Sequence, residues 1–502
     1  MPKRLWIPSL TDFFFLAVIF WLFMADPSGW ERLVTDGDTA LHTRTGDYIL
    51  DHGMVPTADP FSFTKPGERW FAFQWLTGVV YALLNRWFGL KGIVLLAGAV
   101  IALTSTVLVR DMVRRGANGL VAMLLALAAS NAMSIHFHAR PHLFTLLFLA
   151  AAHYLIARDL ESRSWRIWLL APLMLVWVNM HSGFPVLLAT LGLLMAGCGI
   201  EAVMGFKNWS GVKRYGALLA VCAALTLANP NGMELHRHIS RFLNNEWTLQ
   251  HVHEYQSPVF RSEAMYYFMA ILFGGLIAVR TLIARAEWHS VFWLLFFGAG
   301  SLVSARHVPI FIIIALPPIA LELTRLLNSW AEAAGPKSTA EVLREIADKA
   351  TSRLEPVGAW SFGLLGVAAL LAGTWPTDLS AKFFPNKLVH KHADAIAASR
   401  VFTSDQWGDY LLWVNYPRQK VFIDGRSDFF QQQIGDEYLR IHDGQRGWRE
   451  ALDRFGVDMV LAPSDAAVHG LLAAEPGWEM VDKDKQAALY RRKPGVTTAA
   501  AR

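Results

Sequence analysis

Residues 13–42 read FFFLAVIFWLFMADPSGWERLVTDGDTALH, and this stretch determines how the rest of the chain is interpreted. Its first part, from Phe13 to Ala25, is apolar enough to enter a bilayer. Its second part carries Asp36 and Asp38, which should therefore emerge only a short way beyond the lipid boundary. The stretch predicts an apolar helix followed directly by a pair of carboxylates at a membrane face.

The composition of the whole chain agrees with a membrane setting. Hydrophobic residues make up 54% of the 502 residues and charged residues only 17%, and the mean hydropathy is +0.30. A soluble protein of this composition would expose large apolar patches. We therefore predict a polytopic α-helical membrane protein with about 11–13 spans, each near the ~20 residues that cross a bilayer. The apolar runs cover residues 13–25, 93–109, 118–135, 142–157, 166–180, 184–204, 215–229, 265–284, 289–304, 308–326 and 357–375, with a weaker run at 71–88.

Basic clusters in the short connections predict the orientation. The net charge of +5 is modest and its positive residues are spread over these connections, which indicates topology rather than nucleic-acid binding. The positive-inside rule places the clusters and the N-terminus in the cytoplasm. Successive spans must alternate in direction, and with these clusters inside, the segment 71–88 has to be an interfacial or re-entrant helix. The same alternation places the C-terminus outside. The clusters are Pro2-Lys3-Arg4, Arg110–Arg115, Arg158–Arg166, Lys207–Arg214, Arg280–Arg285 and Arg325–Arg353.

The chain divides into four parts. Residues 1–326 form the membrane domain with a large external loop at 26–70, 327–356 a cytoplasmic linker that is either a solvated helix or a flexible connector, and 357–376 the last transmembrane helix. Residues 385–493 have the alternating strand and helix patterns of a small soluble α/β domain. Its strands are expected at 401–403, 420–424, 457–461 and 487–490, and its helices at 433–455 and 464–474.

The N-terminal segment leaves one alternative open. Met1-Pro2-Lys3-Arg4 resembles the charged start of a cleaved signal peptide. Asp12 and the lack of a small-x-small cleavage site favour a retained anchor instead.

Three carboxylates lie in the external loop. Asp38 is the candidate general base, and the alternative is that it caps the helix beginning near Thr39. Asp36 and Asp59 are candidates to orient an acceptor or to share a divalent cation. A shared cation of this kind is the only cofactor that the sequence leaves open.

Several cationic or ionisable side chains lie at helix ends on the predicted outer face. Arg140 and Arg306 are candidates to bind phosphate, since a guanidinium binds it in a bidentate way; the alternative is snorkelling at the lipid boundary. The further candidates for substrate binding are His42, His181 and His307. For His42 and His181, as for His136 and His138, hydrogen-bonded packing is at least as good an interpretation.

Other patterns have simpler interpretations. Cys198 and Cys222 lie in apolar runs and should pack as small hydrophobic side chains. The group His236, His238, His251, His253 and Glu254 fits no compact zinc motif, so a solvated external loop is favoured. The aromatic residues in Ser404–Tyr410, with Trp413, suit either sugar stacking or a domain core, and the core is favoured.

These residues together resemble the GT-C superfamily of membrane glycosyltransferases. Asp38, with Gly53 after an amphipathic stretch, resembles the first external loop of that superfamily, which includes protein O-mannosyltransferases and the aminoarabinose transferases of family 39. Thr39 stands where family 39 has a Glu, and Phe73-Gln74-Trp75-Leu76 stands near the place of its Lys-Pro-Pro-Leu element. A closer likeness, to uncharacterised bacterial membrane proteins, rests on Asp59-Pro60-Phe61-Ser62, Arg140-Pro141-His142, Asn179-Met180-His181, Asn229-Pro230-Asn231-Gly232, Arg306-His307 and Ile423-Asp424-Gly425-Arg426.

The resemblance implies a function. It implies an enzyme of the bacterial inner membrane that moves a sugar from a polyprenyl-phosphate donor to a glycan, lipid or protein acceptor in the periplasm, with inversion and with Asp38 as base. Two alternatives remain: a transporter or flippase of such lipids, and a noncatalytic scaffold for envelope assembly. A transporter usually keeps ionisable groups near the bilayer midplane and repeats its halves, whereas here these groups concentrate at one face.

Overall fold

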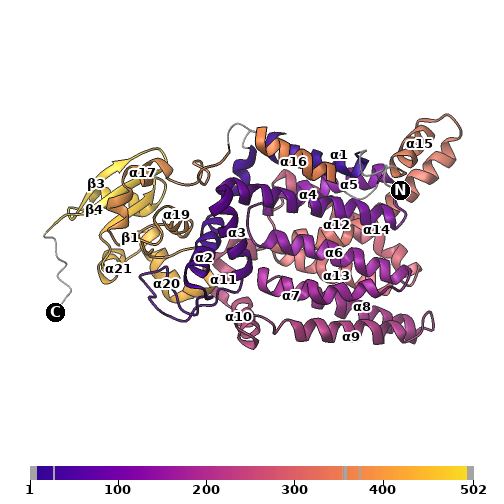
Figure 1. Ribbon diagram of the computed structural model, residues 1–502, viewed down its shortest axis with the longest axis horizontal. Helices are drawn as coiled ribbons and strands as arrows, with labels where there is room; N and C mark the ends of the chain where they lie inside the picture. Colours follow the sequence, from indigo (N-terminus) through magenta and orange to yellow (C-terminus); the bar gives the residue numbers. More distant parts are fainter. Residues whose placement is uncertain (1–7, 26–28, 353, 355–358, 372–374, 495–502) are drawn as a thin grey trace.

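Long apolar helices form the body of the protein. The computed structural model describes residues 8–25, 29–352, 354, 359–371 and 375–494. Most of these helices run side by side along the long axis of the molecule (Figure 1). They are α1 (Leu10–Phe20, continued by a π-helical turn Trp21–Ala25), α4 (Leu90–Arg114), α5 (Gly119–Met133), α6 (His142–Glu161), α7 (Leu170–Met180), α8 (Pro185–Val203), α9 (Ser210–Leu225), α12 (Glu263–Ala284), α13 (Trp288–Val303), α14 (Val308–Ala334) and α16 (Ala359–Leu371).

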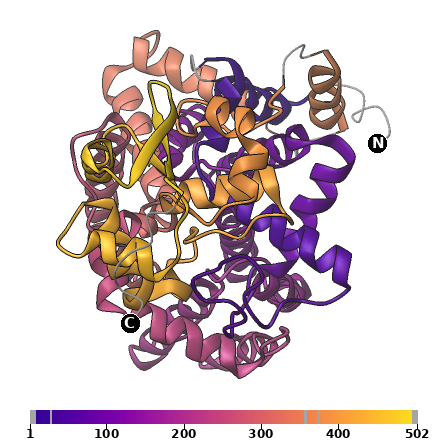
Figure 2. The same ribbon diagram turned by 90° about the vertical axis from the view of Figure 1, so that its left-hand side faces the viewer.

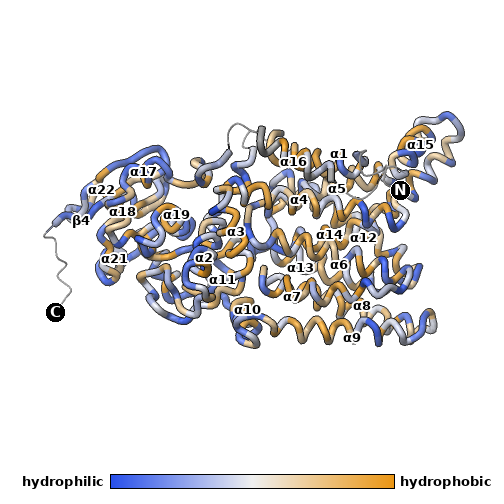
Figure 3. Tube along the Cα trace, viewed as in Figure 1, coloured by the Kyte–Doolittle hydropathy of each residue, from blue (hydrophilic) through white to orange (hydrophobic). Residues whose placement is uncertain are grey.

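Length and hydropathy identify the membrane spans. Among the described residues, six helices are long and apolar enough to cross a bilayer: Leu90–Arg114, Gly119–His136, His142–Glu161, Pro185–Val203, Glu263–Ala284 and Ala305–Ala334. Three shorter apolar helices lie at Leu10–Met24, Trp165–Met180 and Trp288–Val303. Apolar residues dominate the helical body, and polar residues gather at its two ends (Figure 3). The chain is a multi-pass membrane protein.

Two of the predicted features lie partly outside the described residues. The cluster Pro2-Lys3-Arg4 falls there entirely, as do the flanks of the predicted last span, of which the structure describes α16. The predicted linker 327–356 is helical where it is described: α14 extends to Ala334, and α15 (Thr339–Thr351) follows. This second helix is attached to α5, because the Gly119 N–H donates to Thr351 Oγ1 over 2.7 Å.

The segment 71–88 forms α3 (Trp75–Phe88), which lies across one end of the helical body together with α2 (Asp38–His52) (Figure 1). Its 14 residues span about 21 Å, less than the ~30 Å of a bilayer core. Glycines allow the two helices to touch, since a β-carbon at Gly46 would lie 1.9 Å from the Gly78 carbonyl oxygen. At the same end lie the short helices α10 (Met233–Leu243) and α11 (Glu246–His251).

The C-terminal domain is a mixed sheet covered by short helices. The strands β1 (Val401–Phe402), β2 (Met459–Pro463), β3 (Trp478–Lys483) and β4 (Ala487–Arg492) pair in the order β1-β2-β4-β3. β1 and β2 are parallel, and the other two pairings are antiparallel. The helices are α17 (Asn386–Lys391), α18 (Ala393–Ala397), α19 (Asp405–Asn415), α20 (Ser427–His442), α21 (Trp448–Arg454) and α22 (Ala467–Ala474).

Two details of this domain differ from the sequence prediction. Residues 420–424 are not a strand of the sheet: Val421 forms an isolated parallel bridge with Ser62, donating to the Phe61 carbonyl over 2.9 Å and accepting from the Phe63 N–H over 3.0 Å. Its backbone pairs with Ser62 of the external loop, 359 positions away in sequence, and local patterns cannot reveal such a partner. The strand β3 was not predicted, because only its first residue is buried.

The external loop and the C-terminal domain thus form one layer over the end of the helical body (Figure 2). Further contacts join them: Thr64 Oγ1 donates to the Phe422 carbonyl over 2.6 Å, and the Gly37 N–H donates to Gln406 Oε1 over 2.7 Å. Trp407, Tyr410 and Trp413 are buried in α19. They belong to the domain core, and the alternative of an exposed sugar-stacking surface is wrong.

The contact between α2 and α3 gives a test of the fold. Gly46→Ala should lower the unfolding midpoint in detergent by at least about 2 °C, because overpacking costs roughly 1–3 kcal/mol. The control is Gly192→Ala in α8, where a β-carbon meets nothing within 4 Å. Equal midpoints for the two variants would contradict the close packing of α2 on α3.

Candidate functional site

The turn before α2 fixes the two carboxylates that the sequence singled out. Asp36 Oδ1 accepts a hydrogen bond from the Asp38 N–H over 2.9 Å, and Asp38 begins α2. The N-cap is Gly37, and it makes no side-chain capping bond. Asp38 is therefore not the cap of this helix, and its carboxylate is directed elsewhere.

Arg140 binds both of these carboxylates. Its Nη2 lies 2.6 Å from Asp38 Oδ2, and its Nη1 lies 3.0 Å from Asp36 Oδ2. The same Nη1 lies 2.5 Å from Glu254 Oε1. The guanidinium thus binds carboxylates from three places: α2, the turn before α2, and the connection between α11 and α12 that contains Glu254.

Glu254 and Tyr255 are site residues that sequence reasoning missed. Glu254 Oε2 lies 3.5 Å from Arg306 Nη1, which also donates to the Tyr255 hydroxyl over 2.6 Å. Burial raises the pKa of Glu254, but Arg140 and Arg306 outweigh this effect and hold it below its usual value. Glu254 was assigned to a solvated histidine-rich loop, and only the fold shows that it faces two arginines.

A cavity of about 390 Å³ opens beside this ion cluster. Its lining includes the polar or charged side chains of Asp36, Asp38, Arg140, His181, Arg306 and His307. It also includes the apolar side chains of Leu146, Pro185, Val186, Ile239, Phe242, Leu243 and Ile310. The cavity is therefore amphipathic and suits a ligand that joins a charged group to a hydrocarbon chain.

The pKa of Asp38 is raised to about 7. Burial raises it most, Arg140 lowers it, and the neighbouring Asp36 and Glu254 raise it again. A carboxyl group with a pKa near the working pH is suited to accept and release a proton. His42, one turn along α2, has its pKa lowered to about 3, first by burial and then by Arg140, so it is neutral at pH 7.

The C-terminal domain reaches the same carboxylate. A β-carbon at Gly425 would lie 2.5 Å from Asp38 Oδ1 and 2.8 Å from Asp409 Oδ2, so a larger residue here would displace these carboxyl groups. The Gly425 N–H lies 3.2 Å from both Asp409 oxygens. Burial, and then the charges of Asp424 and Asp38, raise the pKa of Asp409 well above its usual value.

His181 is held in one orientation. Its Nδ1 lies 3.0 Å from the Gly183 N–H, which donates to it, and 2.7 Å from Thr145 Oγ1. The Trp177 Nε1–H donates to the same hydroxyl oxygen over 2.8 Å. Because Nδ1 accepts from Gly183, the neutral ring carries its proton on Nε2.

Asp59 does not line the cavity, although the sequence placed it with Asp36 and Asp38. It is buried, and its oxygens accept from the Phe61 and Ser62 N–H groups over 3.0 Å each. Asp59 Oδ1 also lies 2.7 Å from Arg426 Nη1. Asp59 therefore belongs to a second ion cluster, which anchors the C-terminal domain, and we do not include it among the candidate catalytic residues.

Arg426 is the centre of this second cluster. Its Nε and Nη2 donate to the two oxygens of Asp424 over 2.7 and 2.6 Å. Its guanidinium also lies 4.5 Å from the centroid of the Trp70 ring and 4.9 Å from that of Phe429. An ion cluster buried among aromatic rings fixes the Asp424–Asp428 loop beside the cavity.

The other histidines and cysteines that the sequence singled out make separate contacts. His236 contacts Thr226 Oγ1 and His251 contacts the Trp247 carbonyl oxygen, while Cys198 and Cys222 are buried and unpaired. In the part of the chain that the structure describes, no group of three His, Cys, Asp or Glu side chains is arranged to hold a metal ion. The carboxylates of Asp36, Asp38 and Glu254 converge on Arg140 instead.

Comparison with known proteins identifies the fold. No protein-family model and no curated protein sequence matches the chain. Among solved structures, it is similar to the Archaeoglobus fulgidus oligosaccharyltransferase AglB in complex with an inhibitory peptide and a dolichol-phosphate, at 12% identity and a TM-score of 0.58, over 90% of this chain and 69% of that one. The chain is also similar to the Archaeoglobus fulgidus oligosaccharyltransferase in complex with Zn and sulfate. The identity is 11% and the TM-score 0.57, over 90% of this chain and 68% of that one.

A third similar structure is that of ArnT from Cupriavidus metallidurans in the apo state, at 13% identity and a TM-score of 0.50, over 95% of this chain and 96% of that one. These likenesses show that the chain shares the fold of AglB and ArnT, which agrees with the polytopic fold expected from the sequence.

The Arg426 cluster gives a test of how the domain is held. Arg426→Gln should destabilise the protein by about 3–5 kcal/mol, because it leaves Asp59 and Asp424 buried without their cation. Arg418→Gln is the control, since Arg418 is 60% exposed and pairs with an exposed Asp394; such a pair contributes at most about 1 kcal/mol. Thermal unfolding in detergent measures both, and equal losses would show that the cluster does not anchor the domain.

Proposed function

We propose that this protein is a glycosyltransferase that moves a sugar from a polyprenyl-phosphate carrier to a glycan, lipid or protein acceptor. The observation that carries the proposal is the Asp38 carboxylate, bound by Arg140 at the polar end of an amphipathic cavity. The fold supports it, because the similar structures are those of glycosyltransferases.

Asp38 acts as the general base in this proposal. Its carboxylate removes the proton of an acceptor hydroxyl, whose oxygen attacks the anomeric carbon of the donor sugar. The bond from that carbon to the phosphate oxygen breaks, and the electron pair leaves with the phosphate. One carboxylate is sufficient for a single displacement, which inverts the anomeric configuration.

Arg306 is the better candidate of the two arginines for the phosphate. Arg140 is already bound by three carboxylates, whereas Arg306 contacts Tyr255 and, at 3.5 Å, Glu254. The Nε2–H of His181 gives a second donor on the cavity wall. Arg140 instead positions Asp38 and keeps its pKa from rising further.

The apolar side of the cavity accommodates the lipid in this proposal. Leu146, Val186, Ile239 and Ile310 give the cavity lining hydrocarbon surface, and burying each CH₂ of a chain contributes about 0.8 kcal/mol. The similar archaeal enzyme was solved with dolichol-phosphate, which also joins a polyprenyl chain to a phosphate.

The orientation follows from the basic connections. With the N-terminus in the cytoplasm, the ion cluster and the C-terminal domain face the periplasm of a bacterial inner membrane. A transporter is disfavoured because the cluster lies where the external loop and the C-terminal domain meet the helical body. A noncatalytic scaffold would have no need of a buried carboxylate with a pKa of about 7.

Asp38→Asn tests the proposed base. It should lower turnover by about 10²-fold or more, because the amide cannot take a proton, and should leave binding of undecaprenyl phosphate unchanged. In the wild type, kcat/KM should rise about tenfold per unit as pH increases towards 7 and then level off; the variant should lose this rise. Consumption of the donor lipid extracted from a deletion strain, followed by mass spectrometry, measures the rate.

The control for this variant is Asp51→Asn, on the same helix but 51% exposed and paired with Arg86. Wild-type turnover by Asp38→Asn would rule out Asp38 as the base. Loss of undecaprenyl phosphate binding by a folded Asp38→Asn protein would instead make Asp38 a ligand of the donor.

Arg306→Ala tests the proposed phosphate contact. It should weaken undecaprenyl phosphate binding about tenfold or more, because charge-assisted hydrogen bonds in a low-dielectric site are strong. Lysine at this position should rescue only part of the affinity, since it keeps the charge and loses the planar fork. Arg261→Ala, an exposed residue of the same external region, is the control. An Arg306→Ala protein that binds like the wild type would place the phosphate elsewhere.

A further inference from the structure

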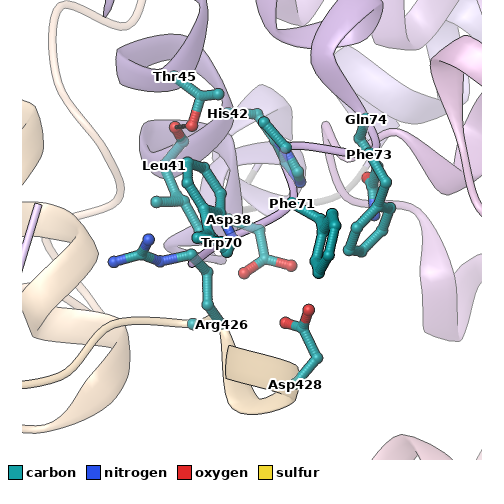
Figure 4. A pocket seen from close by; sticks show the side chains of 12 residues that line it. Asp38, Leu41, His42, Thr45, Trp70, Phe71, Phe73, Gln74, Arg426 and Asp428 are labelled. Carbon is teal, nitrogen blue, oxygen red and sulfur yellow. Dashed lines mark hydrogen bonds between the residues drawn. The ribbon is translucent and has the colours of Figure 1, made fainter. Parts of the chain in front are cut away.

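A second, smaller pocket lies against the Asp38 carboxylate and opens beside the amphipathic cavity (Figure 4). The two spaces share Asp38, Phe73, Gln74, Gly425 and Asp428. The pocket is built from α2, from residues 70–74 of the external loop and from residues 425–428 of the C-terminal domain. A group seated in this pocket would be in contact with the proposed base.

Aromatic rings form much of its wall. Trp70, Phe71 and Phe73 all line the pocket. Phe71 and Phe73 are also packed on the His238 ring, at 5.3 and 5.5 Å between centroids, so both rings have a supported position. Aromatic faces bind the C–H faces of a sugar ring, while its hydroxyl groups need polar partners.

The charges that face the pocket are negative. The carboxylates of Asp38 and Asp428 point into the same space (Figure 4). The Arg426 guanidinium points away from that space (Figure 4), and it is bound by Asp59 and Asp424. The backbone and the aliphatic part of the Arg426 side chain therefore line the pocket, while its positive charge lies outside it.

The nearby histidines do not reverse this balance. His42 lines the pocket and is neutral at pH 7, since burial and Arg140 lower its pKa to about 3. His238 Nε2 lies 2.8 Å from Asp428 Oδ2, so any charge it carries is matched by that carboxylate. Arg140 lines the larger cavity and binds three carboxylates there.

Gln74 adds an acceptor that has no partner. Its Oε1 atom is buried and makes no hydrogen bond within the described part of the chain. A buried carbonyl oxygen without a donor costs about 1–3 kcal/mol, so a hydrogen-bond donor on a ligand that reached this atom would be favourable. Sugar hydroxyl or ammonium groups are donors; an ionised carboxylate is not.

We propose that this pocket holds the transferred sugar and selects a neutral or amino sugar over a sugar that carries a carboxylate. The inference rests on the proposed function and specifies its substrate class. A uronic acid would bring a third negative charge beside Asp38 and Asp428. Two like charges about 4 Å apart repel by several kcal/mol in a partly buried site, which excludes such a sugar.

The first experiment identifies the sugar. Lipids of a deletion strain are extracted, and mass spectrometry determines the sugar on the polyprenyl phosphate that accumulates and that the purified protein consumes. A neutral or amino sugar is expected. A carboxylate on that sugar overturns the pocket assignment and leaves the proposed function intact, whereas a strain that accumulates no lipid-linked sugar, together with a protein that consumes none, overturns the function itself.

The second experiment separates the sugar from its carrier. Asp428→Asn should raise the KM for the donor lipid about fivefold or more while leaving the Kd for undecaprenyl phosphate, which has no sugar, within about twofold. Asp436→Asn is the control, because Asp436 lies in α20 beyond the kink at Gln431 and accepts from Trp247 Nε1 over 2.9 Å without lining either space. The assignment would be overturned if Asp428→Asn weakened the binding of the donor lipid and of undecaprenyl phosphate equally. It would also be overturned if the KM for the donor lipid did not change.

Discussion

The ion cluster around Arg140 is the interaction on which the rest of the site depends. Three carboxylates bind this guanidinium, and each lies more than 100 positions from Arg140 in the sequence. Breaking a buried cluster of this kind costs several kcal/mol, because the charges left behind keep their desolvation penalty. The cluster therefore fixes α2 and the connection around residue 254 against the N-terminal end of α6. Together with burial, it also determines the pKa of Asp38.

The C-terminal domain is part of the site and not an appendage. Gly425 lies so close to Asp38 that no side chain fits between them, and Arg426 is bound by Asp59 from the external loop and Asp424 from its own domain. The Arg140 cluster thus holds residues that line the larger cavity, and the Arg426 cluster holds residues that line the smaller pocket. Since the Arg426 cluster is buried among aromatic rings, the position of Asp428 beside the pocket is as firmly defined as that of Asp38 on its helix.

Sequence patterns predicted the apolar helices, the separate C-terminal domain and the residues Asp36, Asp38, Arg140, His181, Arg306 and His307 that line one cavity. They could do so because hydropathy and helix ends are local properties. Asp59 was misplaced and Glu254 was missed, because the partner of each is an arginine far away in sequence. Residues 420–424 have the composition of a strand, yet their backbone pairs with the external loop, which no local pattern encodes.

A carboxylate with a pKa of about 7 needs opposing influences of similar size. Burial alone would keep Asp38 protonated and unable to act as a base, whereas Arg140 alone would hold it ionised and weakly basic. Asp36 and Glu254 take up part of the charge of Arg140, so that its effect on Asp38 is reduced but not lost. A departing phosphate would add negative charge to the same cluster and raise the proton affinity of Asp38, so the carboxylate becomes a stronger base as the leaving group develops its charge.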